Sequence, residues 1–91
     1  MITLELAKEH LRVRHDDQDT LITSHIQSAD QTLRRFLGDN ADAYADELVA
    51  AELILVEWLF RPDDKVELDP IHQMPRAVVA LAGPYRTPTV A

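Results

Sequence analysis

The feature that most limits how this 91-residue chain can fold is an apolar run that ends in Trp58-Leu59-Phe60-Arg61-Pro62. Its apolar side chains cover nearly every side of a helix: Leu48, Val49, Leu53, Ile54, Leu55, Val56, Trp58, Leu59 and Phe60. A helix that is apolar all round is a buried helix. Because Pro62 cannot continue the hydrogen-bond ladder, we expect the helix to end at Phe60 or Arg61. The run therefore predicts a central helix that is covered on more than one face.

Two further helices are predicted before this run. The first begins with Thr3 as its N-cap and reaches about Leu11. The second begins among the aspartates of residues 16–19, because carboxylates suit an N-cap and a first turn. It carries one apolar stripe at three- and four-residue steps, formed by Ile22, Ile26, Ala29, Leu33, Phe36 and Leu37. Gly38 follows the stripe and is expected to stop this helix in a left-handed conformation.

The C-terminal third of the chain predicts an acidic loop, one short helix and a tail. Two prolines and several acidic residues oppose regular structure in residues 61–73. A short helix with Pro75 in its first turn should reach Gly83, a second left-handed stop, and Pro84 should end it. The remaining residues include two prolines and little apolar surface, so we expect them to be extended unless a partner orders them.

The predicted fold class is all-α, a small bundle of about four helices. A chain of this length has room for one core, which gives a single helical domain over residues 1–83 and an extended C-terminal arm over residues 84–91. A domain of this size buries only about 60–65% of its unfolded surface, so its stability alone is marginal. Three short helices can cover the central helix only in part, and a neighbouring subunit is a natural partner for its surplus apolar surface.

The charge of the chain argues against nucleic acid as a partner. Its net charge is −7, and residues 39–69 hold ten acidic residues against two basic ones. Nucleic-acid binders neutralise phosphates with clustered Lys and Arg, so tight DNA binding is not expected.

The apolar run has acidic residues inside it and is much shorter than the roughly 20 residues that span a bilayer. We expect no membrane segment, and the acidic N-terminus does not resemble a signal peptide.

The sequence contains no pattern of metal-ligating residues. The chain has no cysteine, and its four histidines lack the spacing of a helical zinc site. The aspartates of residues 16–19 resemble the start of a calcium loop, but Leu21 and Ile22 follow where such a loop is still polar. Helix capping is the favoured interpretation of these aspartates. We therefore expect no metal site and no cofactor.

Catalytic chemistry is equally poorly supported. Ser24 and Ser28 lie inside a predicted helix without a glycine elbow, and no glycine-rich phosphate loop occurs. Glu52 and Glu57 lie five residues apart on the apolar helix and so point in different directions, each towards solvent or an arginine. His25 lies on the second helix near its apolar stripe and is expected to be partly buried. The prediction is a protein without catalytic residues, not an enzyme.

The order of these segments resembles the phage head-tail connector family, the adaptor proteins that dock beneath the portal ring. The resemblance covers most of the chain. Its opening part lies in Thr3-Leu4, Ala7-Lys8, Leu11-Arg12-Val13, Asp16-Asp17, Asp19, Leu21-Ile22, Ile26, Ala29 and Leu37-Gly38. Its middle part is the apolar helix with aromatic residues before an arginine, Leu53 through Trp58, Phe60 and Arg61. Its closing part is Pro75, Ala77-Val78, Leu81 and Pro84-Tyr85-Arg86.

The resemblance implies a structural head-completion subunit of a tailed bacteriophage. Such subunits form a homo-oligomeric ring, dodecameric in the particle, between the portal protein and a tail-side stopper or tail completion protein. The ring would continue the DNA channel without binding DNA specifically, and the protein would lie in the virion and, during assembly, in the host cytoplasm. The candidate interface residues are Trp58, Phe60, Arg61, Pro84, Tyr85 and Arg86. The alternative is a small regulatory or antitoxin-like interaction module that acts as a dimer.

Overall fold

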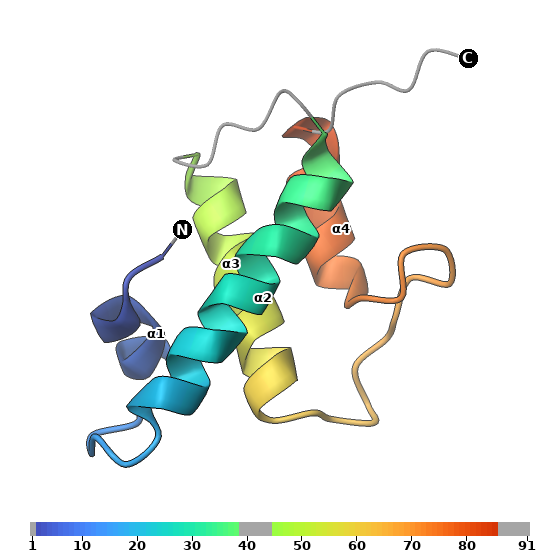
Figure 1. Cartoon of the computed structure of the whole chain (residues 1–91). Coiled ribbons are helices and arrows are strands. Elements are labelled where there is room, and N and C mark those ends of the chain that lie inside the picture. The colour runs from blue at the N-terminus through green and yellow to red at the C-terminus, as the bar shows by residue number, and fades with distance from the viewer. Residues whose placement is uncertain (1, 39–44, 86–91) are drawn as a thin grey trace.

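A computed structural model describes residues 2–38 and 45–85, and within them the fold is all-α, as predicted (Figure 1). Its elements are α1 (Leu4–Leu11), α2 (Asp19–Leu37), α3 (Asp46–Phe60), α4 (Arg76–Ala82) and the 3-10 turn η1 (Gly83–Tyr85). The described residues contain no strand, only an isolated bridge between Leu68 and Pro75. Helix α3 packs against both α2 and α4, and α1 packs mainly on α2. The apolar run is thus the central helix of the bundle.

Helix α1 begins and ends where the sequence predicts. The Thr3 hydroxyl accepts a hydrogen bond of 3.1 Å from the backbone N–H of Leu6, as an N-cap side chain should. At the other end Arg12 adopts a left-handed conformation with φ of 60°, and its N–H binds the carbonyl of Glu9. This turn lets the next backbone N–H, that of Val13, bind the carbonyl of Lys8 at 2.9 Å. Local chemistry alone therefore sets both ends of α1.

Replacing Thr3 by alanine is expected to lower the free energy of unfolding by about 0.5–2 kcal/mol. The reason is that the alanine leaves the N–H of Leu6 without its side-chain acceptor. Urea denaturation followed by circular dichroism measures the loss, and Thr3→Ser is the matched control because it keeps the hydroxyl. Equal destabilisation by both substitutions would show that the cap does not stabilise α1.

The aspartates before α2 differ in role from the prediction. The N-cap of α2 is Gln18 and makes no side-chain capping bond, so the expected aspartate cap is wrong, although Asp19 does lie in the first turn. The ammonium of Lys8 instead lies 2.9 Å from Asp16 and 2.8 Å from Asp19. The hydrogen bonds that the Lys8 ammonium donates to Asp19 and Asp16 raise the pKa of Lys8 above its ordinary value, and the bond to Asp16 lowers the pKa of that carboxyl. These aspartates therefore join α1 to the start of α2.

The two glycines end their helices differently. Gly38 ends α2 with φ of 77°, in the positive region that glycine adopts without strain. Gly83 has φ of −52° and ψ of −45°, so the predicted left-handed stop is wrong there. The chain continues through Pro84 into η1, and Pro75 is the N-cap of α4 rather than a residue of its first turn. An extended arm would accordingly begin no earlier than residue 86, and residues 86–91 lie outside the described residues.

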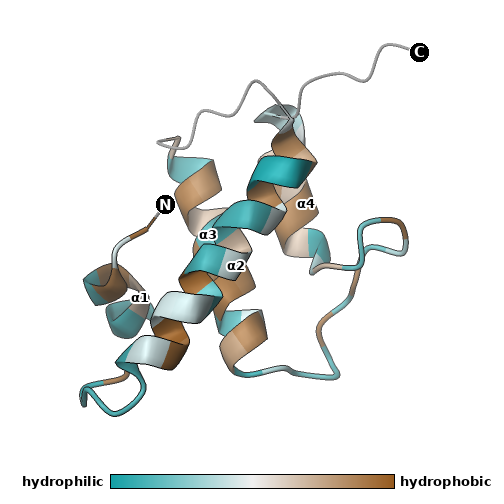
Figure 2. Ribbon diagram, in the orientation of Figure 1, coloured by the Kyte–Doolittle hydropathy of each residue, from teal (hydrophilic) through white to brown (hydrophobic). Residues whose placement is uncertain are grey.

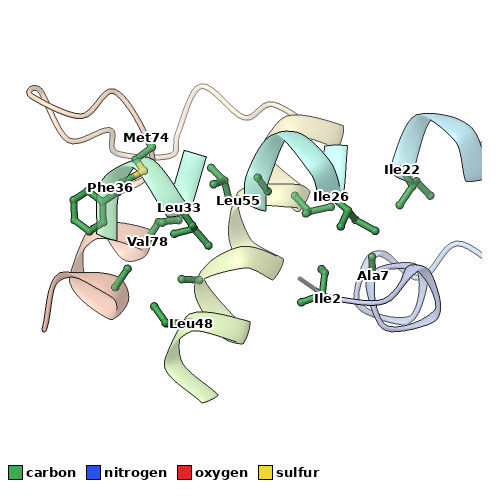
Figure 3. Packing of buried hydrophobic residues seen from close by; sticks show 14 of the residues in the cluster. Ile2, Ala7, Ile22, Ile26, Leu33, Phe36, Leu48, Leu55, Met74 and Val78 are labelled. Atoms are coloured by element: carbon green, nitrogen blue, oxygen red, sulfur yellow. The ribbon is translucent and has the colours of Figure 1, made fainter. Parts of the chain in front are cut away.

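The core lies where α2, α3 and α4 meet, with α1 covering one end (Figures 1 and 2). The whole predicted stripe of α2 is buried, and the fully buried large side chains include Leu11, Ile22, Leu55, Val56 and Val78. Figure 3 shows Ala7 and Ile22 at one end of this core and Phe36 beside Met74 at the other. The acidic segment of residues 61–73 has no helix, as predicted. No helix among the described residues is both long and apolar enough to cross a membrane.

Candidate interaction surfaces around helix α3

The C-terminal end of α3 borders a cleft. The chain leaves α3 at Pro62 and returns at Pro75 to begin α4, so residues 61–75 run beside the last turns of α3. Between them lies a cleft of 290 Å³, lined by Ile54, Glu57, Trp58, Arg61, Asp63, Val66 and Pro75. A second hollow, lined by Pro62, Asp64 and Leu68 as well, shares Trp58, Asp63 and Val66 with it. We call these two connected hollows the Trp58 cleft.

Phe60 and Arg61 lie beside this cleft, against α2. The ring of Phe60 meets that of His25 edge-on, with centroids 6.1 Å apart and planes at 75°. The guanidinium carbon of Arg61 lies 5.3 Å from the centre of the same ring, which is cation–π geometry. His25 is half-buried, which confirms its prediction. Three of the candidate interface residues, Trp58, Phe60 and Arg61, therefore share one end of α3.

Tyr85 lies at the opposite end of the same helix. Its hydroxyl donates a hydrogen bond of 2.6 Å to the carboxylate of Glu47 in the first turn of α3. This bond holds the pKa of Glu47 below its ordinary value. Glu47 and Trp58 are eleven residues apart, which is about 16 Å along a helix axis. The candidate residues thus form two separate groups, with Pro84 and Tyr85 in the second and Arg86 outside the described residues.

A hydrogen-bonded turn with an exposed apolar tip lies in the loop, and the sequence did not predict it. The carboxylate of Asp69 accepts hydrogen bonds from the backbone N–H groups of Ile71 and His72, at 2.9 and 2.8 Å. The Asp69 backbone binds Met74 and Gln73, at 2.8 Å each. At the tip, Ile71 is 82% exposed. We call residues 69–73 the Ile71 turn; Asp69-Pro70 is the turn signal that could have located it.

Comparison with known proteins decides the family. The chain matches the family model of the phage gp6-like head-tail connector proteins over residues 1–85. The chain belongs to this family. Comparisons with curated proteins and with solved structures gave no match. The protein is therefore a structural head-tail connector protein of a bacteriophage, and the matched region includes the Trp58 cleft, the Ile71 turn and Tyr85.

A polar hollow of this connector protein lies on the side of the Ile71 turn. It measures 260 Å³ and is lined by Thr32, Arg35, Phe36, His72 and Met74. The ring of His72 stands at 89° to that of Phe36, with 4.8 Å between centroids. Arg35 is exposed and has no ion-pair partner among the described residues. Nowhere in the described part of the chain do three His, Cys, Asp or Glu side chains gather as a metal ion requires.

The connector core also holds a buried carboxylate. Glu52 is only 5% exposed and accepts a hydrogen bond of 2.9 Å from the backbone N–H of Ile2, so it does not face solvent, the first of the two predicted alternatives. Burial raises the pKa of Glu52 above its ordinary value of 4.5. The charge of an arginine, Arg34, does act on Glu52 and lowers its pKa, against the effect of burial. Asp30 on α2 is also buried and binds Arg34 at 2.8 Å. Glu57, by contrast, is exposed and lies 3.7 Å from His10.

Proposed function

We propose that this connector protein forms a ring that docks on the portal and continues the DNA channel towards the tail. The observation that carries the proposal is the family match over residues 1–85. In the particle the ring would be a dodecamer, placed between the portal protein and a tail-side stopper or tail completion protein. The protein would act at the head-tail junction of the virion after assembly in the host cytoplasm.

The half-covered end of α3 supports assembly with neighbours. Trp58, Leu59 and Phe60 are each half-buried in the single chain, although the helix that carries them is the centre of the fold. Apolar surface around a cleft is typical of a protein–protein contact, and aromatic residues are enriched at such contacts. A small domain also gains the stability it lacks alone when identical subunits cover this surface.

Electron microscopy of the purified protein mixed with its portal tests this function. We expect a ring on the tail-facing side of the portal. Mass measurement in solution addresses the alternative, because a stable dimer that leaves the portal bare would favour a regulatory interaction module. A monomer in solution that forms rings on the portal agrees with the proposal.

A short truncation tests the role of the C-terminal residues. Removing residues 86–91 should prevent attachment to portal-bearing heads and leave the circular dichroism spectrum unchanged, because Tyr85 keeps its hydrogen bond to Glu47. Attachment is scored by sedimentation of heads with labelled connector protein. The matched control is Tyr85→Phe in the full-length chain, which removes that hydrogen bond and keeps residues 86–91. Unchanged attachment after the truncation would contradict a portal-binding arm.

The acidic middle of the chain suits the wall of a DNA conduit. Like charge repels the phosphate backbone, so DNA could pass the ring without being held. We expect no retention of duplex DNA by the purified protein in filter-binding assays at low salt, where electrostatic attraction is least screened. Tight binding under these conditions would contradict the proposed passage without retention.

A further inference from the structure

We propose that the Ile71 turn of one subunit inserts into the Trp58 cleft of the next subunit around the ring. The inference rests on the ring proposed above and names the contact that would close it. Its occupant is a second copy of this chain. The two surfaces are distinct but adjacent: Figure 1 shows the turn standing out beside the start of α4, and the cleft lies between the end of α3 and the loop, with Leu68 and Pro75 at the base of the turn among its lining residues.

The Ile71 turn is built as a rigid projection. Four hydrogen bonds that involve Asp69 fix it, and the bridge between Leu68 and Pro75 closes its base. A fixed turn loses little conformational entropy when it binds, so its exposed apolar tip can contribute fully to affinity. Ile71 is the most exposed large apolar side chain of the described residues at 82%, and nearby Leu68 is 43% exposed. Ile71 is the apolar anchor that would enter the neighbour's cleft, because Leu68 lines the cleft of its own subunit.

The Trp58 cleft offers the matching surface. Its lining includes the apolar side chains of Ile54, Trp58 and Val66, and its volume of 290 Å³ is enough for a branched aliphatic side chain. Trp58 lies half-buried between the two hollows that form the cleft. A large aromatic side chain that a partner buries further is a typical interface hot spot.

The lining of the cleft is mainly acidic, and one exposed basic side chain lies next to the turn. The cleft is bordered by Glu57, Asp63 and Asp64 against the single basic residue Arg61. Next to the turn, Arg35 shares a hollow with His72 and has no ion-pair partner in the described part of the chain. Insertion of the turn would therefore bring an unpaired guanidinium towards an acidic rim. Such complementarity orients the partners and fixes the register of an interface.

The placement of the surfaces is compatible with a ring. A contact in which each subunit gives its turn to one neighbour and its cleft to the other is heterologous, and it forms a ring if the rotation closes. Two subunits that exchange turn and cleft reciprocally would instead form a dimer with two-fold symmetry. The connector ring requires the first of these arrangements.

Cysteine cross-linking tests the contact directly, because the natural chain has no cysteine. Ile71→Cys protein and Asp64→Cys protein are mixed, assembled on the portal and oxidised. A covalent dimer that contains one of each chain, identified by its mass, is the expected product. The matched control replaces Asp64→Cys by Leu21→Cys, which places the thiol at an exposed position of α2. Wild-type rings on the portal combined with equal dimer yields in the two mixtures would overturn the contact and leave the proposed function standing.

Substitutions of the tip give an independent measurement. Ile71→Asp should lower ring occupancy on the portal about tenfold or more, whereas Leu21→Asp should leave it unchanged. Arg35→Glu should weaken the ring, and Asp64→Arg in the same chain should restore it by reversing both charges. Full occupancy with Ile71→Asp, in a variant whose circular dichroism is native, overturns the contact. Absence of any ring with the wild-type protein overturns the proposed function, and the contact with it.

Discussion

Replacing Leu55 by alanine should lower the free energy of unfolding by about 2–5 kcal/mol, because the lost transfer energy adds to that of the cavity left behind. Leu55 is 1% exposed and lies on α3, the helix that packs against both α2 and α4. A chain of 91 residues has a total stability of about 5–14 kcal/mol. The substitution therefore removes a large share of the stability of the isolated subunit.

Urea denaturation followed by circular dichroism, at a concentration where the protein is monomeric, measures this loss. Leu21→Ala is the matched control, because the same atoms are removed from a side chain that is 47% exposed, and a change within about 0.5 kcal/mol is expected. A loss at Leu55 no larger than that at Leu21 would show that α3 is not the centre of the folded subunit. The comparison also separates folding from assembly, since neither residue belongs to the Trp58 cleft.

Most of the fold could be predicted because local chemistry sets it. The hydroxyl of Thr3, the stripe of α2 and the proline after Arg61 each act within a few residues of the helix end or face that they determine. The predictions failed where a distant group intervened. Asp16 and Asp19 bind Lys8 on the preceding helix, and Gly83 continues into a turn that places Tyr85 against Glu47.

The candidate surfaces were predicted less completely, for a related reason. The excess of apolar residues predicted that a neighbouring subunit covers part of α3. Trp58, near the end of this helix, does border a cleft. Periodicity could not show that the loop forms one wall of that cleft, nor that Tyr85 lies at the other end of the helix. Ile71 had no periodic pattern at all, because its exposure depends on a turn that only the hydrogen bonds of Asp69 define.

The burial of Glu52 could not be predicted from the apolar pattern of α3. Removal of this side chain is expected to have the second-largest effect on stability. Glu52→Ala should lower the free energy of unfolding by about 1–3 kcal/mol, because the N–H of Ile2 loses its acceptor in a buried place. Glu52→Gln is the control that keeps a carbonyl oxygen for this N–H and removes the charge. Equal losses in both variants would show that the hydrogen bond to Ile2 contributes nothing.

The raised pKa of Glu52 predicts how the free energy of unfolding changes with pH. Burial, with a contribution from Asp30, raises the folded-state pKa of Glu52 above 4.5, against the opposing effects of the Ile2 N–H, the amino terminus and Arg34. The folded state then binds a proton more tightly than the unfolded chain, and stability falls as the pH rises from 4.5 through the folded-state pKa. The ionised form of Glu52 is therefore less favourable to folding than its protonated form. Compared with the wild-type protein, Glu52→Gln should have similar stability near about pH 4 and higher stability near about pH 8. Urea denaturation at both pH values measures this difference, and a difference that does not change with pH would show that Glu52 has the same pKa in both states.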